Sequence, residues 1–271
     1  QLTAMGTSPG KMNVGGNSYT LVQCHFHYSS EHTVGEQHYP FEAHCVHTKD
    51  GHDGEYGVFG VFFELGAESA FLGNFVGDLP GQPGRRLSAG NVSFNLMGNP
   101  MDSATKRRLA GSTTTSSYTG PLDFKQLYGN IPLTHYWNYF GSFTTPPCTE
   151  AVNFFIMMDT VTLSQAQLDA FKAAIGWGAA GGNFRPPQPV NERVVHGCSV
   201  LSPWYPYPSG PGSSWDSLCY DGTQQSPIDF ASCQTPEERA AVEITWATQT
   251  VELINNGHTV QLTARGSHPG K

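Results

Sequence analysis

Residues 19–28, which read YTLVQCHFHY, alternate between polar and apolar side chains. Such alternation is typical of a β-strand with one buried face. Similar segments rich in β-branched and aromatic residues occur at 41–47, 56–64, 151–158 and 250–264, separated by glycine and proline. The sequence therefore predicts a mainly β fold.

Helix signals are few. Residues 164–175 begin with a serine suited to an N-cap, carry apolar residues at helical spacing and are followed by Gly176. A weaker helix candidate covers 235–242, with Pro236 in its first turn. Residues 202–214 contain four prolines and two glycines, which predicts a loop or linker.

The composition excludes several partners. Charged residues make up 13% of the 271 residues and the net charge is −8, so a nucleic-acid partner is not expected. No stretch approaches the ~20 apolar residues that span a bilayer. None of the six cysteines lies in a C-x-x-C pair, and Asn91-Val92-Ser93 is a glycosylation sequon. These features together favour an oxidising compartment.

The two ends of the chain are similar to each other. Residues 1–11 read QLTAMGTSPGK and residues 261–271 read QLTARGSHPGK, identical at eight of eleven positions and offset by 260 residues. An offset of this length corresponds to a whole domain rather than a solenoid repeat. We therefore expect that the chain is an excerpt of a longer protein with at least two related domains, starting partway through one copy and ending partway through the next.

Three histidines form a candidate metal site. His25 and His27 lie on one face of their predicted strand, because strand side chains alternate. His44, on the next predicted strand, offers the third nitrogen that zinc needs if one tetrahedral position is to remain open for water. Gln23 and Glu42 each lie two residues before a histidine, where they could hold its second ring nitrogen.

Six motifs make the interpretation more specific. They are QCHFH at 23–27, SEHTV at 30–34, EAHCVH at 42–47, GSFTTPP at 141–147, QSPID at 225–229 and NNGH at 255–258. Together they resemble the α-class carbonic anhydrases over nearly the whole chain. In that family QSPID and NNGH precede the first zinc histidine, whereas here they follow it. Moving residues 200–260 in front of residue 1 restores the family order.

The resemblance implies a fold and a domain arrangement. The expected fold is a central, twisted, mostly antiparallel sheet of about ten strands with a few short helices. Residues 1–271 would form a single carbonic anhydrase domain in permuted order. In it, 1–199 supply the central and C-terminal part of the fold, and 200–271 supply the N-terminal part, from a following repeat.

The resemblance also implies a cofactor and a reaction. Zn²⁺ would be held by the three histidines, with Gln23, Glu42 and the carbonyl of Asn183 as the partners of their second nitrogens. Zinc-bound hydroxide would attack carbon dioxide to give bicarbonate and a proton, reversibly. Thr144 would orient that hydroxide while donating a hydrogen bond to Glu31.

Further residues take roles by the same resemblance. His258 would be the proton shuttle, with Asn256 and Gln261 as its polar neighbours. Thr145 would lie beside bicarbonate. The apolar wall where carbon dioxide rests would comprise Val46, Val58, Phe143, Val152 and Phe154. Tyr28 and Phe154 stand where many members carry tryptophan. Tyr205 or Tyr207, and Tyr139, correspond to tyrosines of the family's cleft.

The cysteines are assigned in part. Cys148 and Cys219 match the disulfide pair of secreted family members. The other candidate pair, Cys24 and Cys45, either forms a disulfide or remains as buried thiols. No pairing follows for Cys198 and Cys233.

Location, partners and alternative functions complete the interpretation. We expect an extracellular, periplasmic or cell-surface protein that is inhibited by sulfonamides. Because 1–11 and 261–271 compete for one strand position, segment exchange or self-association through them is also expected. The main alternative is a non-catalytic module of the same fold that serves binding or structure. Two further alternatives are an ester hydrolase and a storage or matrix protein with embedded anhydrase domains.

Overall fold

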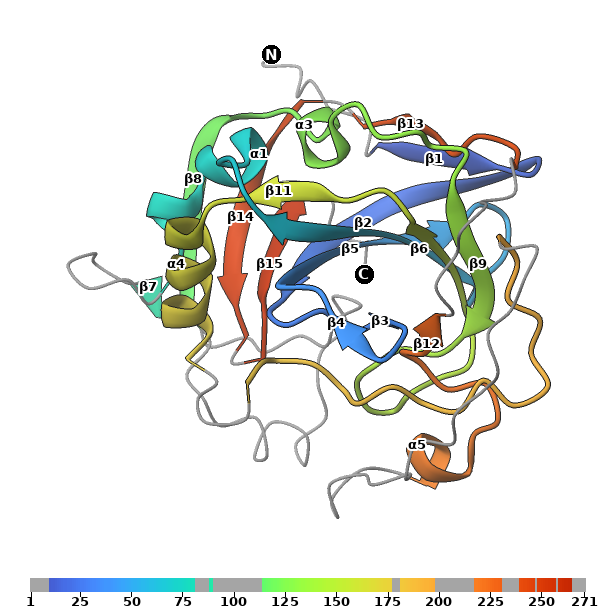
Figure 1. Cartoon of the computed structure of the whole chain (residues 1–271). Helices are drawn as coiled ribbons and strands as arrows, with labels where there is room; N and C mark the ends of the chain where they lie inside the picture. The colour runs from blue at the N-terminus through green and yellow to red at the C-terminus, as the bar shows by residue number, and fades with distance from the viewer. Residues whose placement is uncertain are drawn as a thin grey trace.

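The protein is described by a computed structural model over residues 10–80, 88–89, 114–176, 181–197, 217–230, 239–246, 248–256 and 258–264. A 12-stranded sheet dominates these residues (Figure 1). Its strands are β1 (Lys11–Val14), β2 (Asn17–His27), β5 (Phe41–Lys49), β6 (Tyr56–Leu65), β7 (Ser88–Ala89), β8 (Thr114–Leu122), β9 (Tyr136–Gly141), β10 (Val152–Met157), β11 (Val161–Leu163), β13 (Glu243–Thr245), β14 (Gln249–Asn255) and β15 (Val260–Ala264).

The remaining elements are short. A 3-stranded sheet contains β3 (Thr33–Val34), β4 (Gln37–His38) and β12 (Asp229–Phe230). The helical elements are α1 (Ala70–Gly73), η1 (Val76–Asp78), α3 (Lys125–Tyr128), α4 (Gln165–Ile175) and α5 (Ser217–Asp221). Among the residues just specified, no helix has the length and apolar character needed to cross a bilayer.

The main sheet runs β7-β8-β14-β15-β2-β5-β6-β10-β9, with β1, β11 and β13 off this path. Most neighbouring strands are antiparallel, but β10 and β11 pair with β6 in parallel. The predicted class, a mainly β fold with a large, mostly antiparallel sheet and few short helices, is confirmed. The sheet contains 12 strands, where about ten were expected.

Strands from the C-terminal part of the chain lie in the middle of this sheet. The hairpin of β14 and β15 sits between β8 and β2. One edge of β2 pairs with β5, so β15 and β1 share the other edge: Gln261 faces His25, and Lys11 faces Thr20. Both strands are antiparallel to β2, so they run in the same direction and pair with successive parts of β2.

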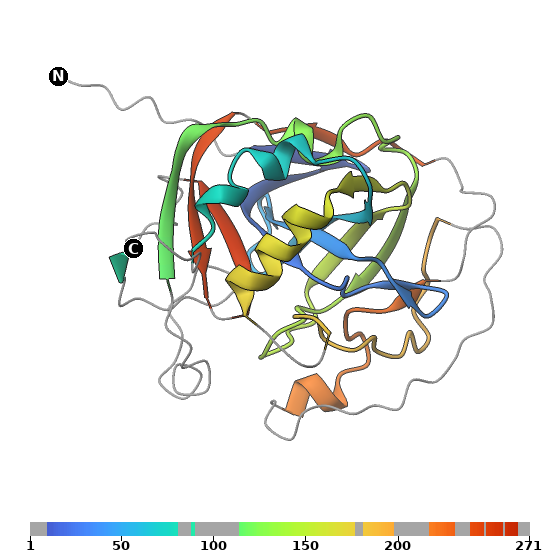
Figure 2. The ribbon, with the colours of Figure 1, turned by 60° about the vertical axis from the view of Figure 1, so that its left-hand side comes forward.

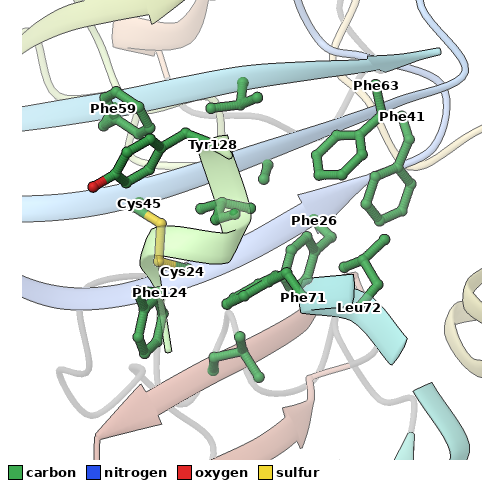
Figure 3. Packing of buried hydrophobic residues seen from close by; sticks show 14 of the residues in the cluster. Cys24, Phe26, Phe41, Cys45, Phe59, Phe63, Phe71, Leu72, Phe124 and Tyr128 are labelled. Carbon is green, nitrogen blue, oxygen red and sulfur yellow. A yellow bond between two sulfur atoms is a disulfide. The ribbon is translucent and has the colours of Figure 1, made fainter. Parts of the chain in front are cut away.

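Helices cover one face of the sheet. Figure 2 shows α1 and α4 lying over the same face. Below them, Phe26, Phe41 and Phe171 pack in a large apolar core, with Phe26 and Phe171 ring centroids 5.2 Å apart. Figure 3 shows the disulfide between Cys24 and Cys45 inside this core. Because side chains alternate along β2, the histidines on either side of Phe26 face away from it.

The α4 prediction is confirmed in detail. Ser164 is the N-cap, and it forms a capping box with Gln167. Gly176 ends the helix in the left-handed conformation at φ 69°, which a residue without a Cβ adopts at little cost.

Two other local predictions need correction. In the helix candidate 235–242, residues 239–242 are not helical, because the N–H groups of Arg239 and Val242 bond to the carbonyls of Thr134 and Leu133. Residues 235–238 lie outside the described residues. The candidate segment 250–264 is not one strand but two, because the Asn256 side chain accepts two backbone N–H groups and turns the chain.

Two disulfides join distant segments of the chain. Cys148 and Cys219 are bonded, as the resemblance implies, with Cα atoms 5.2 Å apart. Of the two alternatives for Cys24 and Cys45, the structure contains the disulfide. The loop or linker at 202–214 and the residues Cys198, Cys233, Asn91, Tyr205 and Tyr207 fall outside the described part of the chain.

Candidate metal centre

Two neighbouring strands carry the three histidines. His25 and His44 face each other directly across the β2–β5 pair, and His27 lies two residues farther along β2. All three side chains are buried. Their ring centroids are 5.0 Å apart for His25 and His27, 5.4 Å for His25 and His44, and 4.9 Å for His27 and His44.

One ring nitrogen of each histidine is already held by the protein. His25 Nδ1 donates to Gln23 Oε1 at 3.0 Å, and His27 Nδ1 donates to the Asn183 carbonyl at 2.9 Å. His44 Nε2 donates to Glu42 Oε1 at 2.7 Å. These bonds fix the tautomer of each ring. They leave Nε2 of His25, Nε2 of His27 and Nδ1 of His44 for a shared ligand.

The remaining nitrogens fit a metal ion. One ligand atom from each histidine lies within 4.8 Å of the other two. His27 Nε2 is buried and has no hydrogen-bond partner, which is rare unless something else binds it. Three imidazole nitrogens are the donor set that suits Zn²⁺ with an open fourth position.

Two overlapping groups are less suitable. In His32, Glu42 and His44 the donors already bond to each other: Glu42 Oε1 accepts from His32 Nδ1 at 2.8 Å as well as from His44. The group of His27, Glu31 and His258 shares His27 with the three-histidine set.

Glu42 accepts hydrogen bonds from other groups besides His44. Its Oε2 accepts the backbone N–H groups of Glu31 and His32 at 2.8 and 3.0 Å. Burial alone would raise the pKa of Glu42, but the charges and hydrogen bonds of His44 and His32 hold it well below its usual range. The carboxylate therefore stays ionised and keeps all four donors. His32 Nε2 in turn lies 2.7 Å from the Tyr139 hydroxyl.

Glu31 and Thr144 meet beside the histidines. Glu31 Oε1 accepts the backbone N–H of Arg185 at 3.1 Å, and Oε2 lies 3.5 Å from His27 Nε2. Burial opposes ionisation of Glu31, but His27, His44 and a hydrogen bond with Thr144 lower its pKa overall. An ionised Glu31 can only accept, so the Thr144 hydroxyl must be the donor of that bond.

Burial keeps two of the imidazoles neutral. It lowers the pKa of His27 to about 4 and, with the neighbouring histidines, that of His25 well below its ordinary value. Burial also acts on His44, but the charge and hydrogen bond of Glu42 raise its pKa overall. Metal ligands must be deprotonated, so the lowered pKa values of His25 and His27 favour metal binding at neutral pH, whereas the raised pKa of His44 opposes it.

An apolar wall adjoins the histidines. Val46, Val58 and Phe154 are consecutive partners across β5, β6 and β10. Val152 belongs to the same cluster, and the partly buried Phe143 packs against it. The ring centroids of Phe154 and His44 are 6.2 Å apart. Thr145, two residues after Phe143, is half-buried. The structure thus gathers the five predicted wall residues into one cluster.

The candidate shuttle His258 also reaches the site. Its ring centroid lies 6.1 Å from that of His27. Asn256 Oδ1 accepts the His258 N–H at 2.9 Å, so this residue shapes the turn that carries the histidine. Gln261 is buried and directly faces His25 in the β15–β2 pair.

The sequence analysis missed Arg185 and Thr259, and named Asn183 only for its carbonyl, not for its side chain. Arg185 donates to Gln225 Oε1 at 3.0 Å, to the Ser226 carbonyl at 2.8 Å and to the Cys219 carbonyl at 2.8 Å, which ties the QSPID segment to the site. The side chains of Asn183 and Thr259 bond to β2. A single sequence carries no signal for such long-range polar contacts.

The fold and the site together define a class: a twisted β-sheet protein with a candidate mononuclear metal centre on three histidines. Residues 3–198 match the model of the eukaryotic-type carbonic anhydrases, and the chain belongs to this family.

Individual relatives agree with this assignment. The chain is 32% identical over 190 residues to a carbonic anhydrase of Klebsiella pneumoniae, covering 70% of this chain and 62% of the relative. A carbonic anhydrase of Neisseria gonorrhoeae is 32% identical over 184 residues, 68% and 58% of the two chains. The match thus spans less than two thirds of the length of these relatives.

Solved structures are similar as well. The α-carbonic anhydrase of Thermovibrio ammonificans in complex with the inhibitor sulfanilamide is 32% identical, with a TM-score of 0.50 and coverage of 67% of this chain and 64% of that one. The α-carbonic anhydrase of Photobacterium profundum is 29% identical, with a TM-score of 0.51 and 70% coverage of both chains.

Proposed function

We propose that the chain catalyses the reversible, zinc-dependent hydration of carbon dioxide to bicarbonate and a proton. The observation that carries this proposal is the convergence of His25, His27 and His44, each with one nitrogen anchored and one within 4.8 Å of the others. Zinc bound there would acidify water and so supply the nucleophile near neutral pH. Family membership supports the same reaction.

Thr144 and Glu31 orient the nucleophile in this proposal. The Thr144 hydroxyl donates a hydrogen bond to the Glu31 carboxylate. The threonine oxygen can then only accept a hydrogen bond from a further group. An acceptor in a fixed place selects one orientation of the attacking group, which is an entropic contribution to the rate.

The apolar wall holds the substrate. Carbon dioxide has no net dipole, so Val46, Val58, Phe143, Val152 and Phe154 suit it better than polar residues would. Thr145 lies next to Thr144 in sequence and would contact bicarbonate.

Removal of the proton is assigned to His258. An imidazole exchanges protons efficiently near neutral pH because the ordinary histidine pKa lies close to 7. Burial lowers the pKa of His258 below this ordinary value. Its position next to His27 supports this role, with Asn256 shaping its turn and Gln261 alongside.

The test is stopped-flow carbon dioxide hydration before and after zinc removal. We expect activity that is lost with the metal, restored by zinc and inhibited by sulfonamides. His44→Ala should abolish it, whereas His52→Ala, at an exposed surface histidine, should not. Stoichiometric zinc binding without hydration would favour the alternative, a non-catalytic binding or structural module.

We also propose that residues 1–271 are a permuted single domain from a tandem-duplicated protein. The collinear β15 and β1 support this, since residues 1–4 and 261–264 both read QLTA and only one can lie beside His25. The copy without a place could then pair with a second chain. Light scattering that finds only monomers at all concentrations would exclude this exchange.

Two disulfides support an extracellular, periplasmic or cell-surface location. Thiol titration of the protein isolated from its natural source would find these four cysteines oxidised.

A further inference from the structure

Asn183 links the segment 181–197 to the end of β2. It is completely buried. Its backbone N–H donates to the Tyr28 carbonyl at 2.7 Å, and its carbonyl accepts from His27 Nδ1. Its side-chain Oδ1 accepts the Tyr28 N–H at 2.7 Å. The backbone of Asn183 therefore serves the candidate ligand His27.

The side-chain amide serves a different residue. Asn183 Nδ2 donates to the Phe26 carbonyl at 3.0 Å and to the His258 carbonyl at 2.8 Å. One planar group thus fixes the backbone of His258 to the strand that carries the ligands. The bond to His258 spans 75 positions of the chain.

The backbone pairing of β15 with β2 does not extend to His258. The β15–β2 ladder ends at Gln261 and His25. Beyond it, the Phe26 N–H bonds to Thr259 Oγ1 at 3.1 Å, and its carbonyl is taken by Thr259 and Asn183 side chains. Side chains therefore replace backbone pairing where His258 lies.

We propose that the Asn183 side-chain amide is a positioning residue that sets the distance between His258 and the metal site. This rests on the proposed function, in which His258 removes the proton. Proton transfer depends on the geometry between donor and acceptor, so a loosened His258 backbone slows that transfer. The binding of carbon dioxide and its conversion to bicarbonate do not need this contact.

The kinetic test uses Asn183→Ala, which keeps the backbone bonds to His27 and Tyr28 but removes the side-chain bonds to Tyr28 and Phe26 as well as the one to His258. We expect kcat to fall roughly 10-fold and kcat/KM to change less than about 2-fold, because only proton release is slowed. Added imidazole buffer should restore kcat. Asn74→Ala, which removes a partly exposed amide at the end of α1, is the control and should leave both unchanged.

A double-mutant cycle with His258→Ala isolates the coupling. In the His258→Ala background, Asn183→Ala should have no further effect on kcat. An equal fall in both backgrounds would overturn the proposal. A wild-type protein that holds zinc but does not hydrate carbon dioxide would instead refute the proposed function, which is a separate result.

Hydrogen exchange of the zinc-free protein gives a readout independent of turnover. Asn183→Ala and the milder Asn183→Ser should speed exchange at 256–259 and leave 41–49 protected as in the wild type. Faster exchange throughout the sheet, or loss of the fold in both variants, would show a merely structural role and overturn the proposal.

Discussion

His25 and His44 stand directly opposite each other in the β2–β5 pair, and the next opposed pair is the disulfide-bonded Cys24 and Cys45. The disulfide lies on the core side of the sheet and the imidazoles on the other. The same two strands therefore carry a covalent link on one face and a candidate metal site on the other. Their register determines whether the histidine nitrogens meet.

Removing the hydrogen-bond partner of one ligand should weaken metal binding. In Gln23→Ala, the Nδ1 of His25 loses its acceptor, so the tautomer and ring orientation are no longer fixed. We expect zinc affinity to fall roughly 10- to 100-fold. Competition with a chromogenic chelator measures it, with Gln165→Ala, at an exposed position on α4, as control. Equal affinities for Gln23→Ala and the wild type would contradict the assignment.

Loss of the Thr144 hydroxyl should lower activity without loss of the metal. Thr144→Val removes the donor to Glu31 and the fixed acceptor beside the site. We expect kcat/KM to fall on the order of 100-fold, the cost of a misplaced reacting group. Zinc content, measured by atomic absorption, should stay at one per chain. Thr162→Val, at an exposed position on β11, should behave as the wild type.

The buried His47 should make stability depend on pH. Its Nε2 accepts from Trp246 Nε1 at 3.2 Å, and burial lowers its pKa from 6.5 to about 4. Below about pH 6.5 the unfolded chain therefore binds more protons at this residue than the folded protein does, so stability falls as the pH drops towards 4. The full effect is about 3 kcal/mol at most.

His47→Gln, which keeps an acceptor for Trp246, isolates this contribution. Urea unfolding at pH 7.5 and 5.0 should show a smaller loss of unfolding free energy for the variant than for the wild type. Equal losses in the two proteins would show that His47 does not titrate on unfolding in this range.

The disulfide between Cys148 and Cys219 should stabilise the assembled chain. The two cysteines are 71 positions apart. On the loop-entropy model, the crosslink therefore raises the free energy of the unfolded state by about 4 kcal/mol. The double variant Cys148→Ala/Cys219→Ala should unfold at a correspondingly lower urea concentration under oxidising conditions. An unchanged midpoint would mean that this bond does not form in the wild type.

Local patterns in the sequence were sufficient for part of the fold. Strand alternation placed both β2 histidines on one face, and the cap signals located α4. These features depend on neighbouring residues only. The motif resemblance then indicated which distant segments belong together, including Cys148 with Cys219.

Other features depend on contacts that no local pattern encodes. Residues 239–242 have a helix-compatible sequence, but their N–H groups bond to the loop at 133–134. Likewise, Arg185 and the amide of Asn183 find partners far away in the chain. Such bonds are decided by the tertiary structure, so only the folded protein reveals them.

The strand order has a practical consequence for engineering this chain. Since β14 and β15 are inserted between β8 and β2, shortening the protein from its C-terminal side would not trim an edge. It would separate β7 and β8 from the other strands of the sheet and expose the unpaired edge of β2 beside His25.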